Sequence, residues 1–350
     1  MKKYLWIIGY SAALTAFTIY ITLDTFVLTK SYTTNASAMS ASAFEDLEAA
    51  ADNSAASSSS TSDTPIKQES QGDGTSKHRK HHNSESVNTN TVSEVEASNE
   101  TSSSIDASDS YTGDTTYSDD NITINLSEYD QYNTKIYVAD VTLSSAEYLK
   151  TAFANDTYGK NITATTSEMA EENSAILAIN GDFYGVQESG YVIRNGIVYR
   201  SEGDGSEVLC IYANGTMEVI NDSEYTAEDL VEKGVWQAFS FGPGLIENGA
   251  ISVDTDDEVD MAMASNPRTA IGIIDTNHYV FVVSDGRTSE SEGLSLYELA
   301  EFMQDLGVTT AYNLDGGGSS TMYFNGQIVN NPTSGRSIKE RGVSDIVYIA

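Results

Sequence analysis

Three aspartates in the C-terminal half of the chain follow or end apolar runs typical of strands, and each stands beside a glycine. Asp182 lies in "NGDFYG", Asp285 in "SDGR" and Asp315 in "NLDGGGSSTM". Carboxylates at the ends of neighbouring strands can converge on one site, where they could act as acid, base or nucleophile. Aspartate with glycine is also a common turn, so each motif taken singly is explained at least as well as a loop.

Arginines and consecutive glycines accompany these carboxylates. Arg268 lies in "NPRTAIG" and Arg287 in "SDGR". A planar guanidinium suits a phosphate group better than a lysine ammonium does. Consecutive glycines cost conformational entropy, but their N–H groups can form a concavity that binds an anion. Together the motifs predict an anionic group held by the two arginines and by backbone and hydroxyl groups of Gly316, Gly317, Gly318, Ser319 and Ser320.

Zinc, thiol and P-loop chemistry find little support in the sequence. Cys210 is the single cysteine, and of four histidines only His278 lies outside a low-complexity tract. "DGGGSS" lacks the lysine of a P-loop and the second glycine of a nucleophile elbow. We therefore expect no metal in the active site and no required cofactor. A structural Ca²⁺ at "DTDDEVD" (254–260) is a separate interpretation, although this run lacks the glycine and the final glutamate of an EF-hand and is more typical of a solvated loop.

The charge balance excludes one large class of partners. The chain has 52 acidic and 18 basic residues, a formal net charge of −34. Such a surface repels nucleic acid, so no nucleic-acid binding is expected. The sequence indicates no oligomeric state.

The first 30 residues read as a membrane anchor. Lys2 and Lys3 precede a run of about 20 mostly apolar residues, which is long enough to span a bilayer. We expect a single-pass cell-membrane protein whose catalytic domain is extracellular. Secretion after signal-peptide cleavage at Ala36-Ser37-Ala38 is the alternative.

Residues 31–120 are rich in serine, threonine and acidic residues and show no hydrophobic period, so we expect a disordered linker. Within it, "KHRKHH" (77–82) could bind metal or an anionic polymer, but a solvated charge cluster is the favoured interpretation. The folded domain is expected at 121–350. Strand patterns there outnumber helices, and Asn195-Gly196 and Asn214-Gly215 predict hairpin turns.

Capping-box spacing predicts helices at 144–153 and from Ser295 to Gly307, and a third is expected at 166–173. The expected fold class is α+β: mixed or antiparallel sheets with a few packed helices in a single globular domain, behind the N-terminal transmembrane helix and the disordered linker.

The four motifs occur in an order that resembles the phosphodiester glycosidase family. "LAINGDFYG", "NPRTAIGI", the segment from "VVSDGR" to "NLDGGGSSTM" and the terminal "RGVSDIVYI" carry the resemblance, and "SFGPGLIENG" fits the bacterial branch of the family. The resemblance implies that the active site contains, or lies near, these residues: Asn180, Asp182, Arg268, Asp285, Arg287, Asp315, Gly316, Gly317, Gly318 and Ser319.

The resemblance further implies hydrolysis of a sugar 1-phosphodiester of the GlcNAc-1-phosphate type, in which the sugar is released. A phosphosugar or cell-wall glycan, in the cell envelope or in exopolysaccharide, is the expected substrate. Our hypothesis is that Arg268 and Arg287 clamp the phosphodiester while Asp315, or as second choice Asp182, acts at the anomeric carbon. A non-catalytic carbohydrate-binding module and another envelope hydrolase are the alternatives left open.

Overall fold

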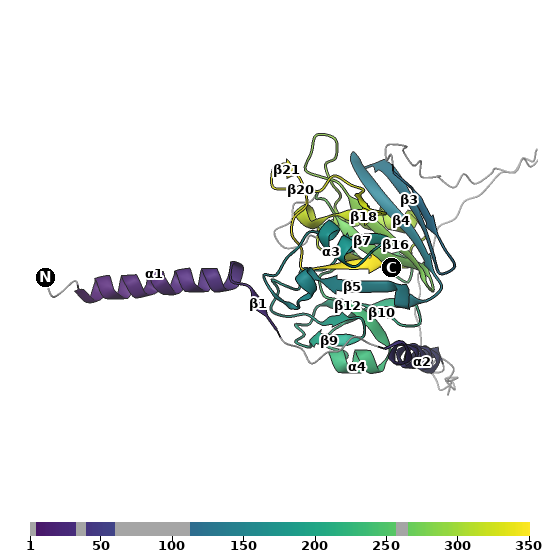
Figure 1. The fold of residues 1–350 in the computed structure, drawn as a ribbon, viewed down its shortest axis with the longest axis horizontal. Coiled ribbons are helices and arrows are strands. Elements are labelled where there is room, and N and C mark those ends of the chain that lie inside the picture. The colour runs from purple at the N-terminus through teal and green to yellow at the C-terminus, as the bar shows by residue number, and fades with distance from the viewer. Residues whose placement is uncertain (1–4, 33–39, 60–112, 257–264) are drawn as a thin grey trace, which may run out of the picture.

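The computed structural model describes residues 5–32, 40–59, 113–256 and 265–350. Three antiparallel sheets form the body of the protein, and helix α1 projects from it (Figure 1). The largest sheet has the order β14 (Ala250–Ile251), β13 (Gly244–Glu247), β17 (Thr310–Leu314), β15 (Thr269–Asp275), β16 (His278–Ser284), β4 (Thr134–Leu143), β3 (Ile122–Gln131) and β2 (Thr116–Ser118).

The other two sheets have five strands each. One has the order β19 (Gln327–Ile328), β18 (Met322–Phe324), β7 (Leu177–Asn180), β22 (Asp345–Ile349) and β5 (Leu149–Phe153). The other has the order β11 (Met217–Asn221), β10 (Glu207–Tyr212), β12 (Val235–Phe239), β8 (Val192–Arg194) and β9 (Ile197–Arg200). Two short ribbons complete the strands: β1 (Lys30–Ser31) with β6 (Gly159–Lys160), and β20 (Thr333–Ser334) with β21 (Ser337–Ile338).

The three sheets share one apolar core, and each buries a second face under a helix. Ile124 of β3, Ile179 of β7 and Leu209 of β10 belong to the shared cluster. Helix α5 (Leu296–Asp305) covers the large sheet, α3 (Thr166–Glu172) covers the sheet of β7, and α4 (Ala227–Glu232) covers the sheet of β10. The expected α+β class with antiparallel sheets and few packed helices is confirmed.

The expected helix at 144–153 is wrong. Ser145, not Ser144, caps a single 3₁₀ turn, η1 (Ala146–Tyr148), and the chain then enters β5, which pairs with β22. Leu149 and Thr151 alternate into the interior, so burial in the sheet overrides the local helix signal. Two further 3₁₀ turns occur, η2 (Ala154–Asp156) and η3 (Gly317–Ser319). The capping box of α5 forms as its sequence predicts, with Ser295 as the cap, and α3 also begins with a capping box, at Thr165, that was not predicted.

The linker expected at 31–120 contains folded elements that the sequence reading missed. Helix α2 (Ala41–Ser59) packs on the domain through Phe44, Leu47 and Ala51, which recur at helical spacing. The Phe44 ring meets Trp236 of β12 edge-on, with ring centroids 4.9 Å apart. Most of the remaining linker, including "KHRKHH", lies outside the described residues.

The apolar N-terminal run forms helix α1 (Leu5–Phe26). Among the helices within the described ranges, none combines the length and hydropathy that crossing a membrane requires. The expected membrane anchor therefore stays a prediction.

Candidate active site

Loops from all three sheets line an open cavity of about 1040 Å³. Its lining includes the residues directly after β17, the loop after β7 and the loop between β12 and β13. The residues that line it are Phe183, Gln187, Gly205, Ser206, Glu207, Asn221, Phe241, Gly242, Pro243, Gly244, Ser252, Val253, Asn266, Arg268, Arg287, Asp315, Gly316, Gly317 and Arg341.

Asp315 is a buried carboxylate in this lining, 9% exposed, immediately after β17. Its Oδ2 accepts hydrogen bonds from Ser319 Oγ at 2.5 Å and from Arg341 Nη2 at 3.1 Å. Burial raises the pKa of Asp315, and the charge of Arg341 opposes that shift. Asp315 is thus held in place at one oxygen by groups that favour its ionised form.

The backbone of Asp315 is held from the neighbouring sheet. Asn180 Nδ2 donates to the carbonyl oxygen of Asp315 at 2.6 Å, while Asn180 Oδ1 accepts from Thr269 Oγ1 at 2.9 Å. The amide of Asp315 donates to the carbonyl of Gly181 at 3.3 Å. The structure therefore places Asn180 behind the cavity, where it positions Asp315.

Close approach of two backbones explains the first two glycines after Asp315. The N–H of Gly317 donates to the carbonyl oxygen of Pro267 at 2.7 Å, and Gly317 has a φ of +62°. A Cβ at Gly316 would lie 2.8 Å from the same oxygen. The N–H groups of Ser319 and Ser320 also donate to carbonyls of their own turn. These N–H groups are therefore not available for the anion cradle that we expected from the sequence.

Three arginines line the cavity. Arg268 is almost fully buried, and its Nε donates to the carbonyl of Leu294 at 2.9 Å. The Nε of Arg287 donates to Asn266 Oδ1 at 3.0 Å. Arg341, which the sequence reading did not single out, contacts both Asp315 and Ser319. Arg341 therefore places a positive charge directly on the Asp315 carboxylate, and Arg268 and Arg287 add two more to the lining of the same cavity.

Ser319, Ser320 and Gly318 do not belong to the cavity lining. The hydroxyl of Ser319 is fully buried and links Asp315 to Arg341. Ser320 is also fully buried. Their positions suit support of the Asp315 turn better than contact with a substrate.

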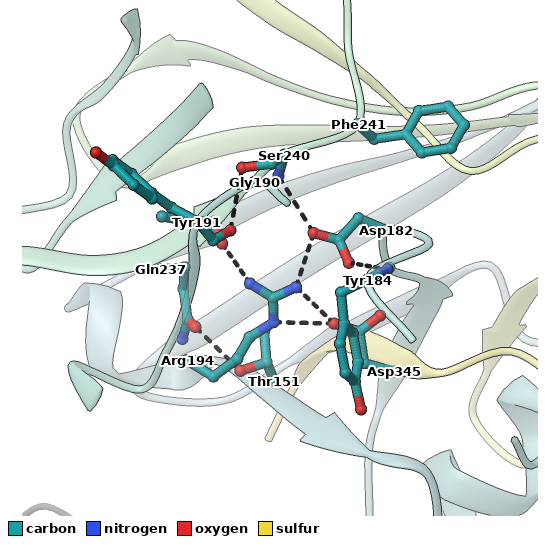
Figure 2. A network of polar contacts seen from close by, with 12 residues as sticks. Thr151, Asp182, Tyr184, Gly190, Tyr191, Arg194, Gln237, Ser240, Phe241 and Asp345 are labelled. Atoms are coloured by element: carbon teal, nitrogen blue, oxygen red, sulfur yellow. Dashed lines mark hydrogen bonds and ion pairs between the residues drawn. The ribbon is translucent and has the colours of Figure 1, made fainter. Parts of the chain in front are cut away.

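Asp182 lies behind the cavity wall in a buried ionic network (Figure 2). Its Oδ2 pairs with Arg194 Nη2 at 2.9 Å, and the same nitrogen lies 2.8 Å from Asp345 Oδ2. The two carboxylates and the guanidinium are each at most 2% exposed. Asp182 does not line the cavity, although the next residue, Phe183, does.

The structure also places Asp285 outside the lining. Its Oδ1 accepts from the N–H of Asn331 at 2.7 Å, and its Oδ2 accepts from Asn331 Nδ2 at 3.0 Å and from Tyr137 Oη at 3.4 Å. Both oxygens are thus occupied in fixing the loop before β20. This geometry indicates a structural role for Asp285, in contrast to the catalytic role considered from its sequence.

The sequence of the C-terminal half decides the family. A family model described as phosphodiester glycosidase (NAGPA) matches residues 173–350, just over half of the chain. The chain belongs to the phosphodiester glycosidase family. The resemblance read from the four motifs is thereby confirmed, and every sequence-derived site candidate lies within the matched range.

Relatives of this chain are found in bacteria and animals. It is 29% identical over 240 residues to the SPbeta prophage-derived uncharacterized protein YomE of Bacillus subtilis, covering 61% of this chain and 36% of that protein. It is 30% identical over 186 residues to the mouse N-acetylglucosamine-1-phosphodiester alpha-N-acetylglucosaminidase, covering 49% of this chain and 36% of that protein. The matched region thus spans about a third of the length of either relative.

A solved structure shares the fold. The catalytic domain of the zebrafish N-acetylglucosamine-1-phosphodiester alpha-N-acetylglucosaminidase, described as auto-inhibited by its pro-peptide, superposes with a TM-score of 0.53 at 21% identity. The match covers 70% of this chain and 86% of that chain. At this identity the similarity concerns the fold alone.

No metal site is evident among the described residues. Within the described ranges, no group of three or more His, Cys, Asp or Glu side chains is arranged to hold a metal ion. The acidic run 254–260 lies partly outside the described residues. His278 pairs with Asp140 at 3.1 Å on the surface of the large sheet.

Three buried carboxyl groups should make the phosphodiester glycosidase fold more stable in mild acid than in mild alkali. Desolvation raises the pKa of Asp285, Asp315 and Asp345, and for Asp345 the charge of Arg194 opposes that shift. A carboxyl whose pKa is higher in the folded state contributes stability that is complete below its unfolded value, 3.8, and is lost as the pH rises through the folded value. We therefore expect the Tm to fall between about pH 5.5 and pH 8.5, by roughly 2–4 °C for each kcal/mol of stability lost.

Asp345→Asn isolates the largest of these contributions. It should flatten the dependence of Tm on pH, while Asp120→Asn, an exposed aspartate, should leave it unchanged. Differential scanning calorimetry over that pH range is the measurement. An unchanged slope in Asp345→Asn would contradict the assignment of the effect to this carboxyl group.

Proposed function

We propose that this protein hydrolyses a sugar 1-phosphodiester and releases the sugar. The observation that carries the proposal is that Asp315 and three arginines line one cavity. Asp315 pairs with Arg341 there, and Arg268 and Arg287 belong to the same lining. A single buried carboxylate beside several arginines suits a substrate with one reacting carbon and an attached anionic group. Membership of the phosphodiester glycosidase family supports this reaction class.

In the proposed reaction, water adds to the anomeric carbon and the bond from that carbon to the phosphoryl oxygen breaks. The phosphate leaves as a monoester of the acceptor and gains negative charge, which Arg287 and Arg341 would stabilise. Asp315 acts at the anomeric carbon either as a general base that takes a proton from the attacking water, or as a nucleophile that displaces the phosphate and forms a glycosyl ester, which the water then hydrolyses. The proposed chemistry requires no metal or organic cofactor.

The substrate class forms part of the proposal. The mouse relative is named for N-acetylglucosamine 1-phosphodiesters, which favours a GlcNAc-1-phosphate type of linkage here. The apolar N-terminal run supports action outside the cytoplasm, on a cell-envelope or exopolysaccharide glycan. Cell fractionation with protease accessibility tests this location, and recovery in the cytosolic fraction would contradict it.

Hydrolysis in ¹⁸O-labelled water tests the reaction itself. The purified full chain is incubated with the methyl diester of N-acetylglucosamine 1-phosphate and with related sugar diesters, with and without EDTA. Cleavage at the anomeric carbon places ¹⁸O in the free sugar, whereas cleavage at phosphorus places it in the phosphate. We expect label in the sugar and equal rates in EDTA.

The other outcomes identify the alternatives. Label in the phosphate would identify a phosphodiesterase in place of a glycosidase. Binding of the diesters without release of sugar would favour the carbohydrate-binding module, for which Phe183 and Phe241 in the lining offer aromatic surfaces.

A further inference from the structure

Arg194 is a fully buried arginine at the end of β8, outside every motif that the sequence singles out. Its Nη2 forms ion pairs with Asp182 and Asp345, and its Nε donates to Asp345 Oδ2 at 2.9 Å. Its Nη1 donates to the carbonyls of Ile193 and Ala238, while the guanidinium stacks over the ring of Phe239 at 4.2 Å.

Burying such a charged network has a high desolvation free energy. Removing a guanidinium from water is unfavourable, and replacing a buried ion pair by apolar residues is often neutral or stabilising. Stability alone therefore does not explain why this position carries an arginine. A planar fork that binds two carboxylates at once does fix their relative positions.

The first carboxylate, Asp182, joins two walls of the cavity. Its Oδ1 accepts the N–H of Tyr184 at 3.0 Å, and its Oδ2 accepts the N–H of Ser240 at 3.2 Å (Figure 2). Phe183 lies inside the first of these turns, and Phe241 follows Ser240; both side chains line the cavity. The orientation of Asp182 therefore determines how the loop after β7 and the loop after β12 meet.

The second carboxylate belongs to Asp345, whose backbone is connected to that of Asp315 through Gly181. The N–H of Gly181 donates to the Asp345 carbonyl at 2.9 Å, and the Gly181 carbonyl accepts the N–H of Asp315 at 3.3 Å. A Cβ at Gly181 would lie 2.3 Å from Asp345 Oδ1, so the carboxylate occupies the space that glycine leaves. Arg194 is thus connected to the two loop walls through Asp182, and to the turn that carries Asp315 through Asp345 and then Gly181.

We infer that Arg194 is a positioning residue for the reaction: its guanidinium holds Asp182 and Asp345 so that the two loops and the Asp315 turn form one preorganised cavity. Asp182 in this arrangement orders the backbone and does not contact the substrate. The inference rests on the proposed hydrolysis at this cavity, but the ordering of the loops can be measured without it.

Arg194→Lys in the full chain keeps the charge and removes the fork, and Arg336→Lys, at an exposed arginine outside the lining, is the matched control. Amide hydrogen exchange is followed in residues 181–190 and 239–244, and kcat and KM are measured with the methyl diester of N-acetylglucosamine 1-phosphate. In Arg194→Lys, we expect amide exchange in these two segments to be at least tenfold faster, and kcat to be at least tenfold lower, than in the wild type. Arg336→Lys should match the wild type in both measurements. The exchange of the α5 segment should not change.

Asp182→Asn provides a second variant of nearly the same size, should Arg194→Lys fail to fold. It should accelerate exchange in the same two segments. Wild-type exchange in both variants, a lower Tm with unchanged kcat, or a lower kcat in Asp182→Asn without faster exchange would each overturn the inference. If the wild-type protein releases no sugar, the proposed function fails, while the exchange data still decide whether Arg194 orders the loops.

Discussion

Asp315→Asn is expected to lower kcat for sugar release by about 10²–10⁴-fold, the range typical of a lost acid–base group. The carboxylate lies in the cavity lining, and Ser319 and Arg341 hold one of its oxygens. Asparagine keeps the size of the side chain and an acceptor for those donors, but it can neither take a proton nor attack carbon. The loss should therefore appear in kcat, with a much smaller change in KM.

Two controls accompany this experiment. Asp140→Asn alters a carboxylate on the surface of the large sheet, paired with His278, and should leave kcat near the wild-type value. The Tm of Asp315→Asn should be equal to or above that of the wild type near pH 8, because burial disfavours the ionised form. Near-wild-type turnover by a folded Asp315→Asn protein would exclude this residue from the chemistry.

Arg341→Gln is expected to shift the pH dependence of kcat/KM. The charge of Arg341 holds the pKa of Asp315 below the value that burial alone would produce, so its removal raises that pKa. If ionised Asp315 is the active form, the acidic limb of the profile moves to higher pH by about 1 unit or more. If protonated Asp315 is the active form, the alkaline limb moves upward in its place.

The direction of that shift thus separates a base or nucleophile from an acid. The Arg341 side chain is 42% exposed, so its replacement should cost little packing. Arg336→Gln removes a comparable exposed charge outside the lining and should leave the profile in place. A profile that does not move in Arg341→Gln would show that Asp315 is not the titrating group.

The sequence predicts which polar side chains stand at strand ends better than it predicts which of them are buried by other parts of the chain. Asp315, Arg268 and Arg287 stand at strand ends where polar side chains are conspicuous, and the structure places all three in the cavity lining. Asp285 has the same local signal, yet the amide groups of Asn330 and Asn331 surround it. Only tertiary contacts distinguish the two cases.

The arginines that the sequence reading missed illustrate the same limit. Arg341 reaches Asp315 across 26 positions of sequence from an irregular segment, so no periodicity indicates its direction. Arg194 directly precedes the Asn195-Gly196 turn, where a charged side chain is ordinarily solvated. Its burial follows from contacts with Asp182, in the loop after β7, and with Asp345 of β22, which a hairpin pattern cannot reveal.

The attachment of β1 to the domain limits the distance between α1 and the cavity. Helix α1 ends at Phe26, and β1 begins at Lys30, where it pairs with β6 of the domain. Four residues reach at most about 14 Å, whereas a flexible tether of about 90 residues would separate its ends by roughly 50 Å on average. Any surface that binds α1 would therefore hold the cavity within a short distance of itself, and the proposed reaction would be limited to substrates close to that surface.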